Sequence, residues 1–107
     1  MTANKVFKAL ADPTRRRVLE LLKEGPLTAG QLSDRFPVSR PTMSAHFSVL
    51  QEAGLIDAEK NGRTVLYRLR MSVLEDALLG FADAFGIEPE GSGRTRRGKG
   101  ALRKKEA

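Results

Sequence analysis

The sequence contains no cysteine and only one histidine. The absence of cysteine excludes disulfides, thiolate metal sites, cysteine nucleophiles and redox sensing through a thiol. A single histidine, without a glycine-rich phosphate loop or clustered carboxylates in an apolar segment, leaves no set of groups for acid–base or metal chemistry. We therefore predict that the chain is not an enzyme and that it uses no cofactor and no metal.

Long apolar runs are also absent. Nothing in the sequence resembles a signal peptide, and no apolar stretch is long enough to cross a bilayer. We expect a soluble protein without a membrane partner, located in the cytoplasm in association with the nucleoid. With 107 residues the chain is long enough for one small domain, which an oligomer interface would help to stabilise.

The positive charge is concentrated near the C-terminal end. The net charge is +6 and the isoelectric point is about 10.2. Residues 91–107 hold seven basic residues and one acidic residue, whereas residues 1–90 hold 12 of each and are net neutral. The positive balance therefore describes the end of the chain and not its body.

This composition predicts a folded domain over residues 1–87 and a disordered basic tail over residues 88–107. The tail is either an inert solubilising end or an arm for non-specific phosphate contacts that release counterions. If it is an arm, deleting residues 91–107 will flatten the salt dependence of nucleic-acid binding.

Two short amphipathic helices are predicted between residues 28 and 56. Leu32 and Phe36 repeat at i and i+4 in the first. Met43, Phe47 and Leu50 repeat at i, i+4 and i+7 in the second, so each helix has one buried stripe. This is the layout of a helix-turn-helix that enters a DNA groove. The outward positions of the second helix carry hydroxyls, one guanidinium and one imidazole, from Arg40, Thr42, Ser44, His46 and Ser48.

Capping signals set the predicted boundaries of these helices and of the two that precede them. A first short helix is expected over residues 3–10. Asp12 and the proline after it start a second helix, which runs to about residue 24. Thr28 caps the third helix, to residue 36, and Ser39 caps the recognition helix, residues 39–53, which Gly54 closes. The second helix is expected to bury Val18, Leu21 and Leu22.

A β-hairpin and a last helix complete the predicted fold. Residues 55–59 and 64–69 read as strands around Asn61-Gly62, a strong hairpin signal. A hairpin directly after a recognition helix is a wing, and Leu27 can add a brief strand. We predict a mainly α winged helix-turn-helix with one small β-hairpin: four helices, two strands and a last helix over residues 72–85.

The last helix has a broad apolar stripe, which packs against the body in a monomer or forms a two-fold interface in a dimer. The first helix is also apolar on one side, and the domain is small, so we expect a homodimer. A two-fold dimer predicts half-sites about one helical turn apart, on the order of 34 Å, in a pseudopalindromic operator. The predicted interface residues are Val6, Phe7, Leu10, Leu74, Ala77, Leu78, Phe81 and Phe85.

Several features allow a simpler interpretation. The helix pair could be a plain helical hairpin. His46 is either a structural histidine or a DNA contact, and its position outside the buried stripe favours DNA. Arg15, Arg16 and Arg17 span too much of a helix circumference to face DNA together; a solvated face, with one of them paired to an acid or a phosphate, is the favoured reading. Arg63, at an exposed wing tip, is expected to contact phosphate or the minor groove.

Four strings resemble the ArsR-type winged helix-turn-helix repressors of bacteria. They are ALADPTRRRVLELL at 9–22, LTAGQLSDRF at 27–36, VSRPTMSAHFSVLQEAGLI at 38–56 and NGRTVLYRL at 61–69. The opening at residues 4–10 is similar to that of the autorepressor branch named for SdpR.

This resemblance implies a homodimer, built from the first and last helices, that binds an inverted-repeat operator on double-stranded DNA and represses transcription, including that of its own gene. The turn at residues 28–30 and Gln31 would touch phosphates. Carried over by position, the other DNA-binding residues are Ser39, Arg40, Pro41, Thr42, Ser44 and His46 on the recognition helix and Lys60, Asn61, Gly62 and Arg63 at the wing tip.

The sensor sites are where the chain departs from that family. The resemblance implies cysteines for arsenic and cadmium sensing, or paired histidines and carboxylates on the last helix for zinc and nickel, and the chain has no cysteine and only His46. Two other functions remain open: a sensor with a non-metal inducer, and a winged-helix module for protein or RNA contacts.

Overall fold

The structure is a computed structural model that describes residues 2–88, and the predicted basic tail lies almost entirely outside this range. The chain divides into two units, residues 1–77 and 78–107. The described elements follow in the order α1 (Thr2–Leu10), α2 (Pro13–Lys23), β1 (Leu27–Thr28), α3 (Ala29–Ser33), α4 (Arg40–Glu52), β2 (Ile56–Asn61), β3 (Thr64–Leu69) and α5 (Met71–Phe85). No helix within the described range is long and apolar enough to cross a membrane.

The predicted caps define the helices of the first unit. The Asp12 carboxylate accepts hydrogen bonds from the first-turn amides of α2, and the Thr28 hydroxyl accepts one from the amide of Gln31. The Gln31 side chain in return accepts from the Thr28 amide, which completes a capping box at α3. Gly54, with φ of +78°, ends α4 in the left-handed conformation that glycine adopts without strain. These local contacts fix where the helix-turn-helix begins and ends.

The brief strand expected at Leu27 is confirmed, and two other details of the sequence prediction were wrong. The sheet has three antiparallel strands in the order β1-β3-β2, because Leu27 and Thr28 pair with Tyr67 and Leu66. The third helix ends at Ser33 and not at residue 36, since the chain tightens there into turns with three-residue hydrogen bonds. In α2, Leu19 is buried with Val18 and Leu22, whereas Leu21 is only half-buried.

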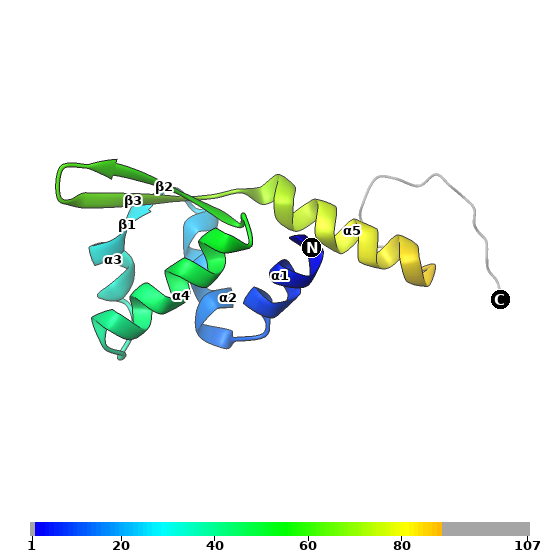
Figure 1. Cartoon of the computed structure of the whole chain (residues 1–107), viewed down its shortest axis with the longest axis horizontal. Coiled ribbons are helices and arrows are strands. Elements are labelled where there is room, and N and C mark those ends of the chain that lie inside the picture. Colours follow the sequence, from blue (N-terminus) through cyan, green and yellow to red (C-terminus); the bar gives the residue numbers. More distant parts are fainter. Residues whose placement is uncertain (1, 89–107) are drawn as a thin grey trace. The chain divides into compact units, whose positions relative to one another are not determined.

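The hairpin turn also differs by one residue from its prediction. Asn61 pairs with Thr64, so the two loop residues are Gly62 and Arg63. Gly62 has a φ of +61°, and among the described residues only glycines have a positive φ. A positive φ at the first loop position alone fits a type II′ turn, which suits the twist of the two strands. Arg63 therefore lies in the two-residue loop that joins β2 to β3, at the tip of the hairpin drawn in Figure 1.

One core joins the helices of the first unit to the sheet. Phe47 of α4 packs on Tyr67 of β3, with ring centroids 4.8 Å apart. Three residues of α5, Val73, Leu74 and Ala77, pack at the edge of this core. The fully or nearly buried apolar residues are Val6, Ala9, Val18, Leu19, Leu22, Leu32, Met43, Phe47, Leu50, Ala53, Leu55, Ile56 and Tyr67.

The described part of the second unit is the end of α5 and the residues after it. The rings of Phe81 and Phe85 lie 4.9 Å apart. Gly86, with φ of +69°, ends the helix: its amide bonds to the Asp83 carbonyl, and the Ile87 amide bonds to the Ala82 carbonyl. This pair of hydrogen bonds is a Schellman motif, which satisfies the last carbonyls of the helix.

Candidate nucleic-acid interface

The first half of α4 presents small polar side chains to solvent. The Ser39 hydroxyl caps the helix by accepting from the Thr42 amide at 3.3 Å, and it donates to the Thr42 hydroxyl at 2.9 Å. Ser44 and Ser48 continue the exposed surface along the helix. Met43, Phe47 and Leu50 are buried on the opposite side, as the spacing predicted.

The outermost position of α4 holds a residue that the sequence analysis missed. Opposite the buried stripe, the helical projection places Pro41, Ala45 and Ser48, and all three are exposed. Ala45 has no polar group, and the sequence analysis therefore did not select it. Its methyl side chain nevertheless allows a DNA backbone or base edge to approach closely. The helical projection alone was enough to identify it.

Arg40 and its neighbourhood supply positive charge beside this face. Its Nη2 lies 3.1 Å from Asp34 Oδ1, with 67% and 73% of the two side chains exposed. An ion pair this exposed contributes little and exchanges readily, so the guanidinium remains available to a phosphate. Arg35 is exposed and has no ion pair within residues 2–88. Sequence analysis missed Arg35, and the only signal was its position in the loop before α4.

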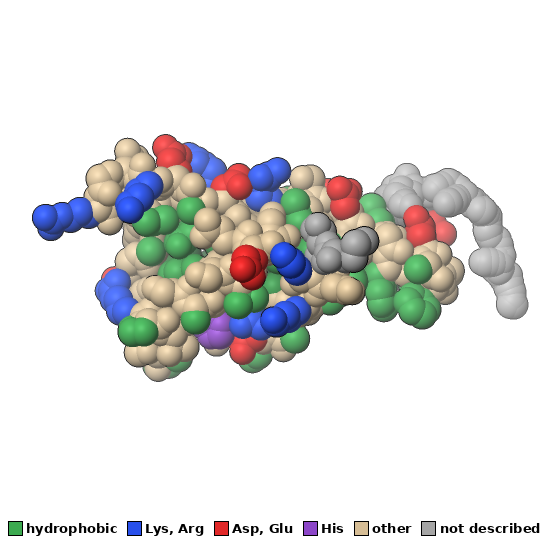
Figure 2. Space-filling model, viewed as in Figure 1, with side chains coloured by type: hydrophobic (Ala, Val, Ile, Leu, Met, Phe, Trp, Pro, Cys, Tyr) green, Lys and Arg blue, Asp and Glu red, His purple; other side chains and the backbone are tan. Residues whose placement is uncertain are grey.

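The wing tip is a second cationic site. Lys60, Asn61, Gly62 and Arg63 are all exposed, and neither cation has an ion pair in the described part of the chain. Lys and Arg side chains gather at the end of the view where the hairpin tip lies, on the left of Figure 2. The N-terminal end of α4 lies toward the same end in Figure 1. Ten of the eleven predicted DNA-binding residues are therefore exposed, as side chains or as glycine.

Farther from the tip, the cations of the hairpin are neutralised. Arg68 Nη1 lies 3.1 Å from Glu59 Oε1, and Arg70 Nη1 lies 3.0 Å from Asp57 Oδ1. These pairs leave the tip as the part of the wing with uncompensated positive charge. An anionic ligand is attracted to the tip and not to the base of the hairpin.

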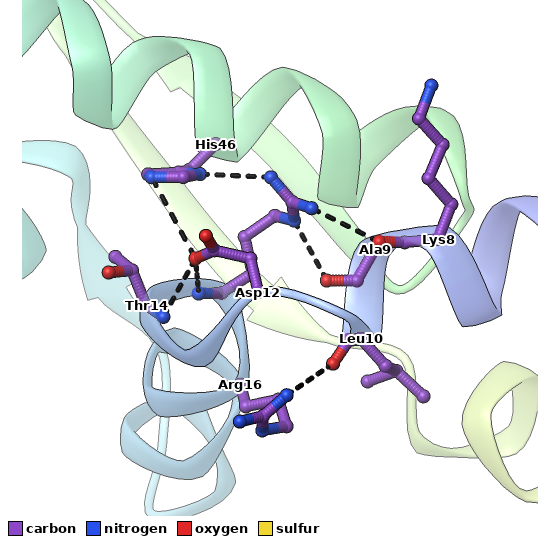
Figure 3. Close-up of polar contacts among 8 residues, drawn as sticks. Lys8, Ala9, Leu10, Asp12, Thr14, Arg16 and His46 are labelled. Carbon is purple, nitrogen blue, oxygen red and sulfur yellow. Dashed lines mark hydrogen bonds and ion pairs between the residues drawn. The ribbon is translucent and has the colours of Figure 1, made fainter.

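His46 is the exception among the predicted contacts, because only 16% of its side chain is exposed. Its Nδ1 lies 3.1 Å from Nη1 of Arg15, and its Nε2 lies 4.0 Å from Oδ2 of Asp12 (Figure 3). Arg15 also donates from Nε to the Ala9 carbonyl at 2.8 Å and from Nη2 to the Lys8 carbonyl at 3.1 Å. The imidazole on α4 thus faces the junction of α1 and α2 and not solvent.

The carboxylate of Asp12 is held ionised by this junction. Partial desolvation raises its pKa, but hydrogen bonds from the amides of Arg15 and Thr14, together with the nearby His46 and Arg15 side chains, outweigh that effect and lower the pKa below its ordinary value of 3.8. The negative charge at the N-terminal end of α2 is also favourable for the helix dipole.

The three consecutive arginines each bond within the chain. Arg15 bonds to α1 and α4 as described above. Arg16 Nη1 donates to the Leu10 carbonyl at 2.7 Å, and Arg17 Nη1 lies 2.9 Å from Glu20 Oε1. The reading that this group does not face DNA together, and that one member pairs with an acidic residue, is consistent with these bonds.

The predicted interface residues fall into three groups by exposure. Val6 is fully buried in the core of the single chain. Phe7, Leu10, Leu74 and Ala77 are partly buried. Exposure rises in the second unit, to 46% for Leu78, 47% for Phe81 and 69% for Phe85. Val6 is therefore a core residue of the single chain with no surface for a partner, whereas the other predicted interface residues are at least partly exposed.

Comparison with known proteins identifies the family. A helix-turn-helix domain family matches residues 10–59. The transcriptional repressor SdpR of Bacillus subtilis is 43% identical over 75 residues, which cover 70% of this chain and 83% of SdpR. The chain belongs to the ArsR family of winged helix-turn-helix transcriptional regulators.

Solved structures of ArsR regulators have the same fold. An ArsR-like transcriptional regulator from a Rhodococcus species matches with a TM-score of 0.69 and 33% identity, over 79% of each chain. A homodimeric winged helix-turn-helix DNA-binding domain from Mycobacterium bovis, described as a possible ArsR-family regulator, matches with a TM-score of 0.64 and 27% identity, over 78% of this chain and 79% of that one. The function of the present ArsR protein is therefore transcriptional regulation through a DNA-binding helix-turn-helix.

The relatives of this ArsR chain described above are named as transcriptional regulators and not as enzymes. Within residues 2–88, no group of three or more histidine, cysteine, aspartate or glutamate side chains is arranged to hold a metal ion. The prediction that no metal is bound stays a prediction.

Proposed function

We propose that this chain is a sequence-specific repressor that binds an inverted-repeat operator as a homodimer, including an operator at its own promoter. The observation that carries the proposal is the pairing of an exposed, hydroxyl-rich face on α4 with uncompensated cations at the wing tip, toward one end of the first unit. Small polar side chains suit contacts with base edges, and mobile cations suit phosphates.

The exposed face of α4 enters the major groove in this proposal. Thr42, Ser44 and Ser48 meet base edges, and Ala45 allows close approach. Arg40 leaves Asp34 and binds a phosphate or a guanine. The start of α3, which the capping box at Gln31 holds in place, lies against the phosphate backbone of the DNA. Lys60 and Arg63 at the wing tip contact phosphate or the adjacent minor groove.

The dimer is formed by a second copy of the same chain. The exposed Leu78, Phe81 and Phe85 form an apolar face on the second half of α5, and a two-fold partner covers such a face with the same face of its own. The homodimeric Mycobacterium bovis relative supports this assembly. A two-fold dimer binds two half-sites about 34 Å apart, which requires an inverted repeat. Such a regulator acts in the cytoplasm, where the chromosome is.

Footprinting on the DNA upstream of the protein's own coding region tests the proposal. We expect a protected inverted repeat. Arg40→Ala should lower the affinity for that operator by about tenfold to a hundredfold, the range of one good base or phosphate contact. Arg17→Ala is the matched control, because Arg17 is also an exposed, ion-paired arginine at a helix surface, but lies on α2.

Three results would contradict the proposal. Equal losses for the two arginine variants would show that only net charge matters. Protection without sequence preference would indicate an architectural role. Tighter binding to RNA than to any duplex DNA would indicate an RNA-interaction module.

A further inference from the structure

The contacts between α4 and the α1–α2 junction are of two kinds. Met43, Phe47 and Leu50 bury the apolar face of α4, but apolar contacts have little directionality and tolerate small shifts of the helix. The bond between Arg15 and His46 is directional, and it joins side chains 31 residues apart in the chain. This bond can therefore fix the rotation of α4 about its own axis and its position along that axis, relative to the α1–α2 junction.

Arg15 reaches α4 while its other nitrogens are bound to α1. The last carbonyls of α1, from Lys8 and Ala9, accept from Nη2 and Nε. A guanidinium holds its donors in one rigid plane, so the two bonds to α1 fix the direction of the third donor, Nη1, toward His46 Nδ1 (Figure 3). Lysine cannot replace this arrangement, because its ammonium lacks a planar fork.

The imidazole is held from its second side as well. Asp12, which caps α2 through the amides of Thr14 and Arg15, places Oδ2 at 4.0 Å from His46 Nε2. Because Arg15 donates to Nδ1, that nitrogen must carry no proton, and the neutral ring has its proton on Nε2, toward the Asp12 carboxylate.

We propose that Arg15 and His46 are positioning residues for DNA recognition, which set the placement of the recognition helix α4 on α1. This inference rests on the proposed function. In the proposed dimer α1 belongs to the interface. The Arg15–His46 bond therefore also links the position of each recognition helix to the arrangement of the two subunits. A shift of about 1 Å in such a site is enough to weaken recognition. His46 then acts through Arg15 and α1 and does not itself contact a base.

The ring tautomer can be measured directly in the full-length protein without DNA. His46 is the only histidine, so a long-range ¹H–¹⁵N spectrum contains one imidazole. At a pH where the ring is neutral, we expect the Nε2–H tautomer, with an unprotonated Nδ1. Arg15→Lys should shift this signature toward a mixture of tautomers. A wild-type ring protonated on Nδ1 would overturn the proposal.

Two substitutions of His46 separate positioning from direct contact. In His46→Asn the amide oxygen takes the place of Nδ1 and can still accept from Arg15, whereas in His46→Gln the amide reaches the place of Nε2 and the Nδ1 acceptor is lost. Positioning predicts near wild-type operator affinity for His46→Asn and about a tenfold loss for His46→Gln. The reverse order would show that His46 touches DNA through Nε2.

A double-mutant cycle completes the test. Arg15→Lys and His46→Gln should each lower operator affinity about tenfold, and the double variant should lose no more than either alone, because both remove the same contact. Both should also discriminate less between the operator and a version with one base pair inserted between its half-sites. Arg16→Lys is the matched control, since within residues 2–88 the Arg16 side chain bonds to the Leu10 carbonyl and not to α4, and the substitution keeps the charge.

Thermal melting and gel filtration verify that each variant is folded and has the size of the wild type. Additive losses, or an Arg15→Lys variant that binds and discriminates like the wild type, would overturn the inference alone. If wild type and Arg16→Lys both bind DNA without sequence preference, the proposed function is wrong, and so is the positioning role that rests on it. The tautomer measurement does not depend on DNA binding and would remain valid.

Discussion

Two polar regions of the first unit use similar side chains in opposite ways. At the α1–α2 junction, the Arg15 guanidinium donates hydrogen bonds to two carbonyls and one imidazole, all within the chain. At the wing tip, Arg63 is exposed to solvent and has no ion pair in the described part of the chain. One arginine is satisfied by the protein and the other by water.

The difference shows which polar groups are available to a ligand. A group that is partly buried must find partners in the protein, because an unsatisfied polar group away from water is costly. An exposed group loses nothing by remaining with water, and it can exchange water for a phosphate when DNA arrives. Helix α4 has polar groups of both kinds. Its His46 faces the α1–α2 junction, and the hydroxyls of Thr42, Ser44 and Ser48 face solvent.

The largest expected effect separates the inward and outward faces of α4. Phe47 is 3% exposed and packs on Tyr67, so Phe47→Ala should lower the free energy of unfolding by about 3–5 kcal/mol. Ser48, the next residue, is exposed. Ser48→Ala should change the free energy of unfolding by less than about 0.5 kcal/mol, and the variant should bind the operator more weakly. Urea unfolding measures the first quantity. Similar unfolding midpoints for the two variants would contradict the assignment of the two faces.

A smaller effect is expected at the wing. Arg63→Ala should reduce the slope of log affinity against log salt by about 1, because one phosphate contact is lost, and leave stability unchanged. Arg68→Ala is the control on the same hairpin, since Arg68 is paired with Glu59. Fluorescence anisotropy with labelled operator DNA gives the slopes. The contrast between paired and unpaired cations would fail if both variants changed the slope equally.

The sequence was sufficient for the features that depend on neighbouring residues. The Asp12, Thr28 and Ser39 caps and the left-handed Gly54 are recognisable because each cap acts within three or four residues. The buried stripe of α4 follows from helical periodicity, and the exposed hydroxyls follow from the stripe. Together they predicted the helix-turn-helix and most of its outer face.

The features that were missed depend on residues far apart in the chain. The role of His46 is set by Arg15, 31 residues away, and periodicity says only that the ring lies beside the buried stripe. The hairpin turn was displaced by one residue because its position depends on strand register as well as on the Asn-Gly pair.

The smallest expected effect concerns a polar group that is turned inward on the sheet. Tyr67 is 8% exposed, and burial raises the pKa of its hydroxyl above the ordinary value of 10.0. A raised folded-state pKa gives stability that is present below the unfolded value and is lost as the pH rises through the folded value. The chain has one tyrosine, so the phenolate absorbance band reports Tyr67 alone.

We expect the phenolate band to appear at higher pH in the folded protein than in urea, and Tyr67→Phe to lose less stability than wild type between about pH 9 and about pH 11. A folded-state midpoint at or below the unfolded one would show that the hydroxyl is solvated. Tyr67 would then belong with the outward polar groups, although its ring still packs on Phe47.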